Sequence, residues 1–228
     1  MALFASDTVA LDIGSYAIKG AVVNPRSGLK KYAAVPTPQG AAIGGTINNP
    51  EELVAALKQL WQMLGAKGSD VISAVPSQYV FVRNFTLPMM KKSELEQAVK
   101  FQTEGQIPLP PAELVLDFAV LSEDKKAKQM EVMVAATRRS VIQQMVQILA
   151  QAELNAKVFD LESLALSRVF LNTERKQAGD GWDMFISTGA NTTHISIFER
   201  NRLLFTRSIP FGGFRFTRAL SMEQSISV

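Results

Sequence analysis

Two stretches of the chain, one near its start and one in its last quarter, share a pattern. Residues 11–20 read LDIGSYAIKG and residues 186–195 read ISTGANTTHI, and they align without a gap so that Gly14 matches Gly189. Each copy is an apolar run, a glycine with small polar residues, and a second apolar run that returns. The repeat predicts one tight hairpin in each half of the chain, and the two hairpins can face each other across a cleft.

A glycine turn suits a phosphate group, because it exposes backbone N–H groups with no side chain in the way. Lys19 adds a positive charge, and Asp12 at the end of the first strand is placed to hold a magnesium ion through water. Neutral donors are available from the polar residues of both turns, Ser15, Asn191, Thr192 and Thr193. The paired hairpins therefore indicate a site that holds a triphosphate from both sides.

The residues alone leave a second interpretation open. Aspartate and glycine are ordinary turn formers, so one Asp-x-Gly hairpin is typical of a plain turn at a sheet edge. Two copies in the same register favour the phosphate interpretation. Other nucleotide and nucleophile motifs are absent from the sequence, namely GxxxxGK[ST], GxGxxG and GxSxG.

Composition excludes several classes of protein. The 228 residues include no cysteine and one histidine, His194, which argues against disulfides, zinc-cysteine sites, histidine-rich metal sites and Ser-His-Asp triads. Hydrophobic residues make up 47% of the chain, as expected for a soluble globular protein with a core. The net charge of +3 is spread over small pairs rather than a basic block, so we expect no nucleic-acid partner.

Neither a signal peptide nor a membrane span is expected, because residues 1–7 lack a basic start and no window holds about 18 apolar residues. A helix is predicted over residues 50–64, with Asn49 as its cap and Pro50 in its first turn. Hairpins and helices then alternate, and the polar segment 175–183 is a predicted boundary. This order predicts an α/β protein with mixed sheets.

The doubled hairpins resemble those of the actin, hexokinase and heat-shock chaperone ATPase superfamily. The middle of the chain carries a more specific pattern: AVPS at residues 74–77, Leu87-Pro88, a helix from Ser93, IPLP at 107–110 and Asp117-Phe118. With these residues the chain resembles the type IV pilus assembly protein PilM family, from about Val9 to Phe214. The cell-division protein FtsA is a more distant relative.

The resemblance implies an actin-like (ribonuclease H-like) two-lobe α/β fold with mixed sheets and an inserted αβ subdomain. Residues 1–78 and 160–180 would form the first lobe, and residues 79–159 an inserted peptide-docking subdomain. Residues 181–228 would begin the second lobe. We expect that lobe to be incomplete, because family members continue for about another hundred residues, consistent with two-lobe domain sizes.

The resemblance also implies ATP and Mg in the cleft. The residues that would bind the nucleotide are Asp12, Gly14, Ser15, Tyr16, Lys19, Gly189, Ala190, Asn191, Thr192, Thr193, Gly212 and Gly213, with Asp12 holding Mg through water. The implied partner is the cytoplasmic N-terminal tail of a PilN-like inner-membrane protein, with other pilus assembly proteins beside it. The chain would then lie in the cytoplasm at the inner face of the inner membrane.

One departure bears on catalysis. Family members commonly carry an acidic residue where this chain has Ser187, so we expect nucleotide binding with at most slow hydrolysis, and no catalytic residue is assigned. Asp160 is either a helix cap or a carboxylate that faces the nucleotide, and His194 is interpreted as a strand residue. Two alternatives remain, a small-molecule kinase of the same superfamily and an FtsA-like filament-forming protein.

Overall fold

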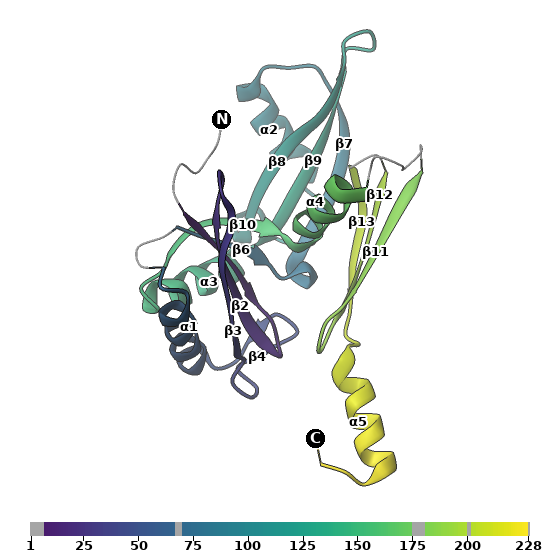
Figure 1. Ribbon diagram of the computed structural model, residues 1–228. Helices are drawn as coiled ribbons and strands as arrows, with labels where there is room; N and C mark the ends of the chain where they lie inside the picture. Colours follow the sequence, from purple (N-terminus) through teal and green to yellow (C-terminus); the bar gives the residue numbers. More distant parts are fainter. Residues whose placement is uncertain (1–6, 67–69, 175–180, 200–201, 228) are drawn as a thin grey trace.

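The first sheet is mixed, as the sequence predicts. The computed structural model describes residues 7–66, 70–174, 181–199 and 202–227 (Figure 1). Strands β1, β2 and β3 form an antiparallel meander, and β6 and β10 are added in parallel beside β1, in the order β10-β6-β1-β2-β3. The strands are β1 Thr8–Ile13, β2 Ala17–Asn24, β3 Gly28–Pro36, β6 Asp70–Val75 and β10 Asn155–Leu161.

Two helices cover one face of this sheet, α1 (Pro50–Leu64) and α3 (Arg139–Gln151). Asn49 caps α1 as predicted, since its side chain accepts a hydrogen bond from the N–H of Glu52. The helix lies close to β2 because Gly20 has no side chain: a Cβ there would lie 2.6 Å from Leu64 Cδ1. We call this sheet with its two helices the first lobe.

The inserted subdomain is a three-stranded antiparallel sheet in the order β7-β9-β8, with α2 (Lys92–Thr103) on one face. Its strands are β7 Val80–Pro88, β8 Leu114–Asp124 and β9 Gln129–Arg138, and β8 and β9 form a hairpin. Two short 3₁₀ turns, η1 (Ser77–Tyr79) and η2 (Pro111–Glu113), precede β7 and β8.

The last part of the chain is a second antiparallel meander, β11 (Trp182–Thr188), β12 (Thr193–Glu199) and β13 (Arg202–Ile209). Helix α5 (Gly213–Gln224) follows and extends beyond the end of the sheet (Figure 1). We call β11–β13 with α5 the second lobe. Helix α4 (Glu162–Glu174) joins it to the first lobe. The predicted boundary at residues 175–183, like residues 1–6, falls largely outside the described residues.

Packing divides the chain differently from the sequence-based division in one respect. Helix α3 and most of strand β10 lie within the predicted inserted subdomain, 79–159, yet both elements belong to the first lobe. Ile148 and Leu149 of α3 are buried in the core under β1, and β10 pairs with β6. The reason is that the apolar face of α3 needs a partner, and the inserted sheet is already covered on one face by α2 and on the other by β12 and β13.

Leu57 tests the first-lobe core. Its side chain is fully buried in the cluster between α1 and the sheet, so Leu57→Ala should lower the free energy of unfolding by about 2–5 kcal/mol. Urea denaturation followed by far-UV circular dichroism measures this change. Gln59→Ala, on the exposed face of the same helix, is the matched control and should leave stability within about 0.5 kcal/mol of the wild-type protein.

Candidate functional site

The two glycine hairpins have the same geometry. In the first, Asp12 pairs with Lys19 and the Gly14 N–H donates to the carbonyl of Ala17 at 3.2 Å. In the second, Ser187 pairs with His194 and the Gly189 N–H donates to the carbonyl of Thr192 at 2.8 Å. The gapless repeat predicted from the sequence is confirmed, down to the strand register and the turn hydrogen bond.

After each glycine, the backbone offers donors to the cleft. Within the part of the chain that the structure describes, the N–H groups of Ser15, Tyr16, Ala190 and Asn191 make no hydrogen bond. Successive free N–H groups in a turn form a concave site for an anion. Glycine is required at the first turn, because a Cβ on Gly14 would lie 2.8 Å from the Ala17 carbonyl oxygen.

Both hairpins line one cavity of about 1270 Å³. Nine of the predicted site residues lie in its wall: Asp12, Gly14, Ser15, Tyr16, Lys19, Gly189, Ala190, Asn191 and Thr192. A volume of this size exceeds that of a typical small-molecule site, about 300–1000 Å³. The structure therefore brings most of the predicted set together around a space large enough for a nucleoside triphosphate.

Three predicted residues, Thr193, Gly212 and Gly213, lie outside that wall. Thr193 donates its hydroxyl to the carbonyl of Phe211, and the Gly213 N–H donates to the carbonyl of Gly189. A Cβ on Gly212 would lie 2.5 Å from the Ala190 carbonyl oxygen. These residues do not line the cavity, and they hold the second hairpin against the start of α5.

The charged residues of the first hairpin form an ion pair at the cavity. Lys19 Nζ donates to Asp12 Oδ2 at 2.7 Å, and both side chains are partly exposed. Lys19 Nζ also lies 3.5 Å from the position of a Cβ on Gly14, so the cation stands at the turn itself. An anion at this turn would meet a positive charge and free N–H groups together.

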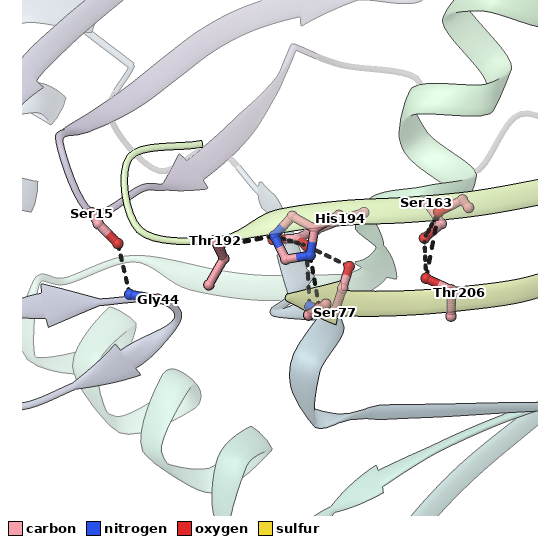
Figure 2. A network of polar contacts seen from close by, with 10 residues as sticks. Ser15, Gly44, Ser77, Ser163, Thr192, His194 and Thr206 are labelled. Carbon is pink, nitrogen blue, oxygen red and sulfur yellow. Dashed lines mark hydrogen bonds and ion pairs between the residues drawn. The ribbon is translucent and has the colours of Figure 1, made fainter. Parts of the chain in front are cut away.

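The second hairpin obtains its carboxylate from another element. His194 lies opposite Ser187 in the strand pair. Its Nε2 is 3.6 Å from Oε2 of Glu162, the first residue of α4. Ser77 donates both its N–H and its hydroxyl to the same oxygen, at 3.1 and 2.5 Å (Figure 2). Oε1 of Glu162 has no hydrogen bond to the residues that the structure describes, and Glu162 lines the cavity.

Sequence reasoning missed Glu162 and considered only the nearby Asp160, either as a helix cap or as a carboxylate that faces the nucleotide. Asp160 also lines the cavity, but both its oxygens accept hydrogen bonds from Arg168, and these bonds raise the pKa of Arg168. The available signal was the position of Glu162 at the junction of a strand and a helix, two residues after Asp160. His194 lies in a strand as interpreted, with Nδ1 2.8 Å from the Ser208 hydroxyl oxygen and Nε2 3.2 Å from that of Thr192.

A second missed feature is the turn between the two-residue strands β4 (Ala42–Ile43) and β5 (Thr46–Ile47). The Gly44 N–H donates to the Ser15 hydroxyl oxygen at 2.8 Å (Figure 2). Gly44 adopts a left-handed backbone, and a Cβ there would lie 3.1 Å from Thr192 Cγ2. The turn therefore touches both hairpins, and the Gly44-Gly45 pair was its signal in the sequence.

Comparison with known proteins places the chain in a family. The model of the family described as type IV pilus assembly protein PilM matches residues 10–227. The chain belongs to the PilM family. A solved PilM-PilN type IV pilus biogenesis complex is similar, with 27% sequence identity, a TM-score of 0.85, and coverage of 98% of this chain and 67% of that one.

Two further structures share the fold at low identity. They are the ethanolamine utilization protein EutJ from Carboxydothermus hydrogenoformans and the cytoplasmic domain of EpsL, an inner-membrane component of the type II secretion system of Vibrio cholerae. EutJ is 14% identical, with a TM-score of 0.57 and coverage of 99% of this chain and 59% of that one. EpsL is 11% identical, with a TM-score of 0.56 and coverage of 90% and 71%.

The predicted fold class is confirmed: this PilM family member is an actin-like α/β protein with mixed sheets and an inserted αβ subdomain. Its function in type IV pilus assembly follows from the family. Across the described helices, none combines the length and apolar character that a membrane crossing requires.

The residues of the cleft fit a triphosphate with magnesium. Asn191 Oδ1 is buried and has no hydrogen-bond partner among the described residues, so a donor on a ligand or a metal-bound water would satisfy it. No cluster of three acidic or histidine side chains suited to a metal occurs in the described ranges.

Glu162→Ala should destabilise the protein, because it leaves the partly buried N–H and hydroxyl of Ser77 without their acceptor. We expect a loss of about 1–3 kcal/mol in the free energy of unfolding, measured by urea denaturation. Glu162→Gln, which retains an acceptor oxygen, should recover most of this loss. Equal stabilities for the alanine variant and the wild-type protein would show that the contact is dispensable.

Proposed function

We propose that this PilM family protein binds ATP with magnesium between its two hairpins and docks the cytoplasmic N-terminal tail of a PilN-like inner-membrane protein. The observation that carries the nucleotide part is the identical geometry of the hairpins. Each presents free N–H groups to one cavity that also contains Lys19 and Asp12. Actin-like relatives imply nucleotide binding in general, and the identity of the ligand as ATP belongs to this proposal.

The roles of the residues follow from their positions. The N–H groups after Gly14 and Gly189 would bind phosphate oxygens from opposite sides, and Lys19 would exchange its contact with Asp12 for the phosphates. Asp12 would then hold magnesium through water. The metal would neutralise phosphate charge, which lowers the cost of bringing a triphosphate beside the three carboxylates of the cavity wall, Asp12, Asp160 and Glu162. Gly212 and Gly213 would act indirectly, by holding the second hairpin in place.

We propose that hydrolysis is slow at most. A general base must reach the attacking water with a carboxylate or imidazole that is free to take its proton. Each cavity carboxylate of the described residues has a partner: Asp12 binds Lys19, Asp160 binds Arg168 through both oxygens, and Glu162 binds Ser77 through Oε2 beside His194, while its Oε1 stays free. This arrangement supports a protein whose function depends on holding a nucleotide.

The docking proposal uses another part of the same cavity. Beyond the hairpins, its wall continues along α3 through Gln143, Gln144 and Gln147 and reaches Arg138, where the inserted subdomain meets the first lobe. Amide side chains can pair with both donors and acceptors of an extended peptide backbone. The resemblance over 98% of this chain to a complex that contains PilN supports such a partner. Through it, the protein would lie at the cytoplasmic face of the inner membrane.

Nucleotide binding should depend on the hairpin glycines. Gly14→Val and Gly189→Val should each weaken ATP-Mg binding at least about tenfold in titration calorimetry, because a branched side chain displaces the turn N–H groups. Gly181→Val is the matched control, since a Cβ there meets no atom within 4 Å, and its affinity should equal that of the wild-type protein. Unchanged affinity in both hairpin variants would disprove the proposed phosphate site.

Peptide binding should depend on the wall formed by α3. A synthetic peptide of the cytoplasmic N-terminal tail of the PilN-like protein from the same organism is the probe, titrated by fluorescence anisotropy. Gln143→Trp fills the cavity and should weaken binding at least about tenfold. Gln151→Trp, on the same helix but outside the cavity wall, should bind as the wild-type protein does. Equal affinities for the two variants would place the peptide elsewhere.

A further inference from the structure

The inserted sheet is covered on both faces by different parts of the protein. Side chains of β7 and β9 that point to one face, including Phe85, Val132 and Val134, pack under α2. On the other face, Met133 is buried in one cluster with Phe198 and Leu203 of the second lobe. Phe198 and Leu203 are almost fully inaccessible, at 0% and 1% exposed. The inserted subdomain and the second lobe therefore share a small hydrophobic core.

Polar contacts reinforce the same interface. Arg202 of β13 donates from Nη1 to Glu131 of β9 at 2.7 Å, and from Nη2 to Glu199 of its own sheet at 2.6 Å. Asn84 of β7 donates its side-chain amide to the carbonyl of Leu203 at 2.8 Å. In Figure 1, β7 lies alongside β13 over this region. Because Arg202 binds a carboxylate on each side, it joins the two sheets directly.

The contact between the inserted subdomain and the first lobe is different in kind. Among the described residues, the first-lobe core contains no residue of the inserted sheet, whereas Met133 shares a cluster with Phe198 and Leu203. The chain enters the subdomain through η1, where Ser77 is bound to Glu162 of α4, and leaves it at Arg138, where α3 begins. Arg139 at the start of α3 also donates to the carbonyls of Ala112 and Leu114, so the contact with the first lobe is polar. Apolar packing therefore attaches the inserted sheet to the second lobe and not to the first.

We propose that the inserted subdomain and the second lobe move as one body relative to the first lobe, so that the nucleotide in the cleft regulates peptide docking. This inference rests on the proposed function. A triphosphate held by both hairpins would change the angle between the lobes, because one hairpin belongs to each. Because of the shared core and the contacts of Arg202 and Asn84, the inserted sheet would move together with the second lobe. The sheet would then shift against α3, whose glutamines line the peptide part of the cavity.

The absence of cysteine from the sequence makes the motion directly measurable. Spin labels on pairs of introduced cysteines report distances between Gln59 (first lobe), Met184 (second lobe) and Glu96 (inserted subdomain), all exposed sites. On addition of ATP-Mg, the Gln59–Met184 and Gln59–Glu96 distances should both change. The Met184–Glu96 distance should stay constant. A Met184–Glu96 distance that changes as much as Gln59–Met184 would overturn the proposal.

A variant of the interface tests the link itself. Asn84→Ala with Arg202→Ala should broaden the Met184–Glu96 distance distribution even without nucleotide. Lys157→Ala, which removes an exposed ion pair with Asp70 inside the first lobe, is the matched control and should leave it narrow. Arg202→Gln, which keeps the apolar cluster, replaces the double variant if that variant does not fold. An unbroadened distribution in a folded interface variant would contradict the proposal.

The same peptide titration, with and without ATP-Mg, measures the regulation. In the wild-type protein the two affinities should differ by about five- to 150-fold, the usual range of coupling between sites, and in the interface variant the ratio should approach one. Equal affinities in the wild-type protein, with both ligands bound, would refute the regulation while the proposed function stands. If ATP-Mg does not bind, the proposed function fails, and the ligand-free distance distributions still decide whether the two parts form one body.

Discussion

The site depends on one hydrogen bond that occurs twice, from a glycine N–H to a carbonyl three residues later. It closes each hairpin tightly, and the following N–H groups, on residues that line the cavity, have no acceptor in the described chain. Sheet pairing keeps this geometry in place, because the strands on either side of each turn are in full antiparallel register. The helices, the cores and the β4–β5 turn all serve to bring these two turns to the same space.

The two hairpins differ in how they are charged. The first hairpin has an ion pair of its own, Lys19 with Asp12. The second has Ser187 and His194 at the matching positions, and the carboxylate beside His194 is Glu162 of α4. Glu162 also binds Ser77, at the entry to the inserted subdomain. The cleft is therefore connected, through a few direct contacts, to the element that joins the lobes and to the subdomain beside them. This arrangement is consistent with an assembly protein whose sites influence each other.

Burial on both faces explains the character of β9. Its residues 132–136 are apolar without a break, which is typical of a strand covered on both sides. Alternate side chains enter two cores, one under α2 and one against β12 and β13. Glu131 is the partly exposed exception on the second face, and it is bound by Arg202. The polar contact at the rim of an apolar interface fixes which surfaces meet, and the apolar area supplies most of the stabilisation.

Local pattern in the sequence was sufficient for the elements and for the repeat. Hydrophobic periodicity, glycine turns and the Asn49 cap predicted α1, the hairpins and their common register, because these depend on residues near one another in the chain. Nine of the twelve predicted site residues line the cavity for the same reason: they follow directly from the two turns. Family resemblance added the actin-like fold and the pilus assembly role, which no local pattern contains.

Only the tertiary structure decided which distant residues complete the site. Glu162 meets Ser77 across 85 positions of the chain, and Gly44 meets Ser15 across 29, so neither contact has a signature in nearby residues. The same holds for α3, which packs on the first lobe instead of the subdomain where the sequence-based division had put it. A sequence determines what each segment can bury or cap. Which partner a segment packs against depends on the free energy of the whole folded chain. An apolar face is buried against the uncovered surface that the chain topology brings next to it.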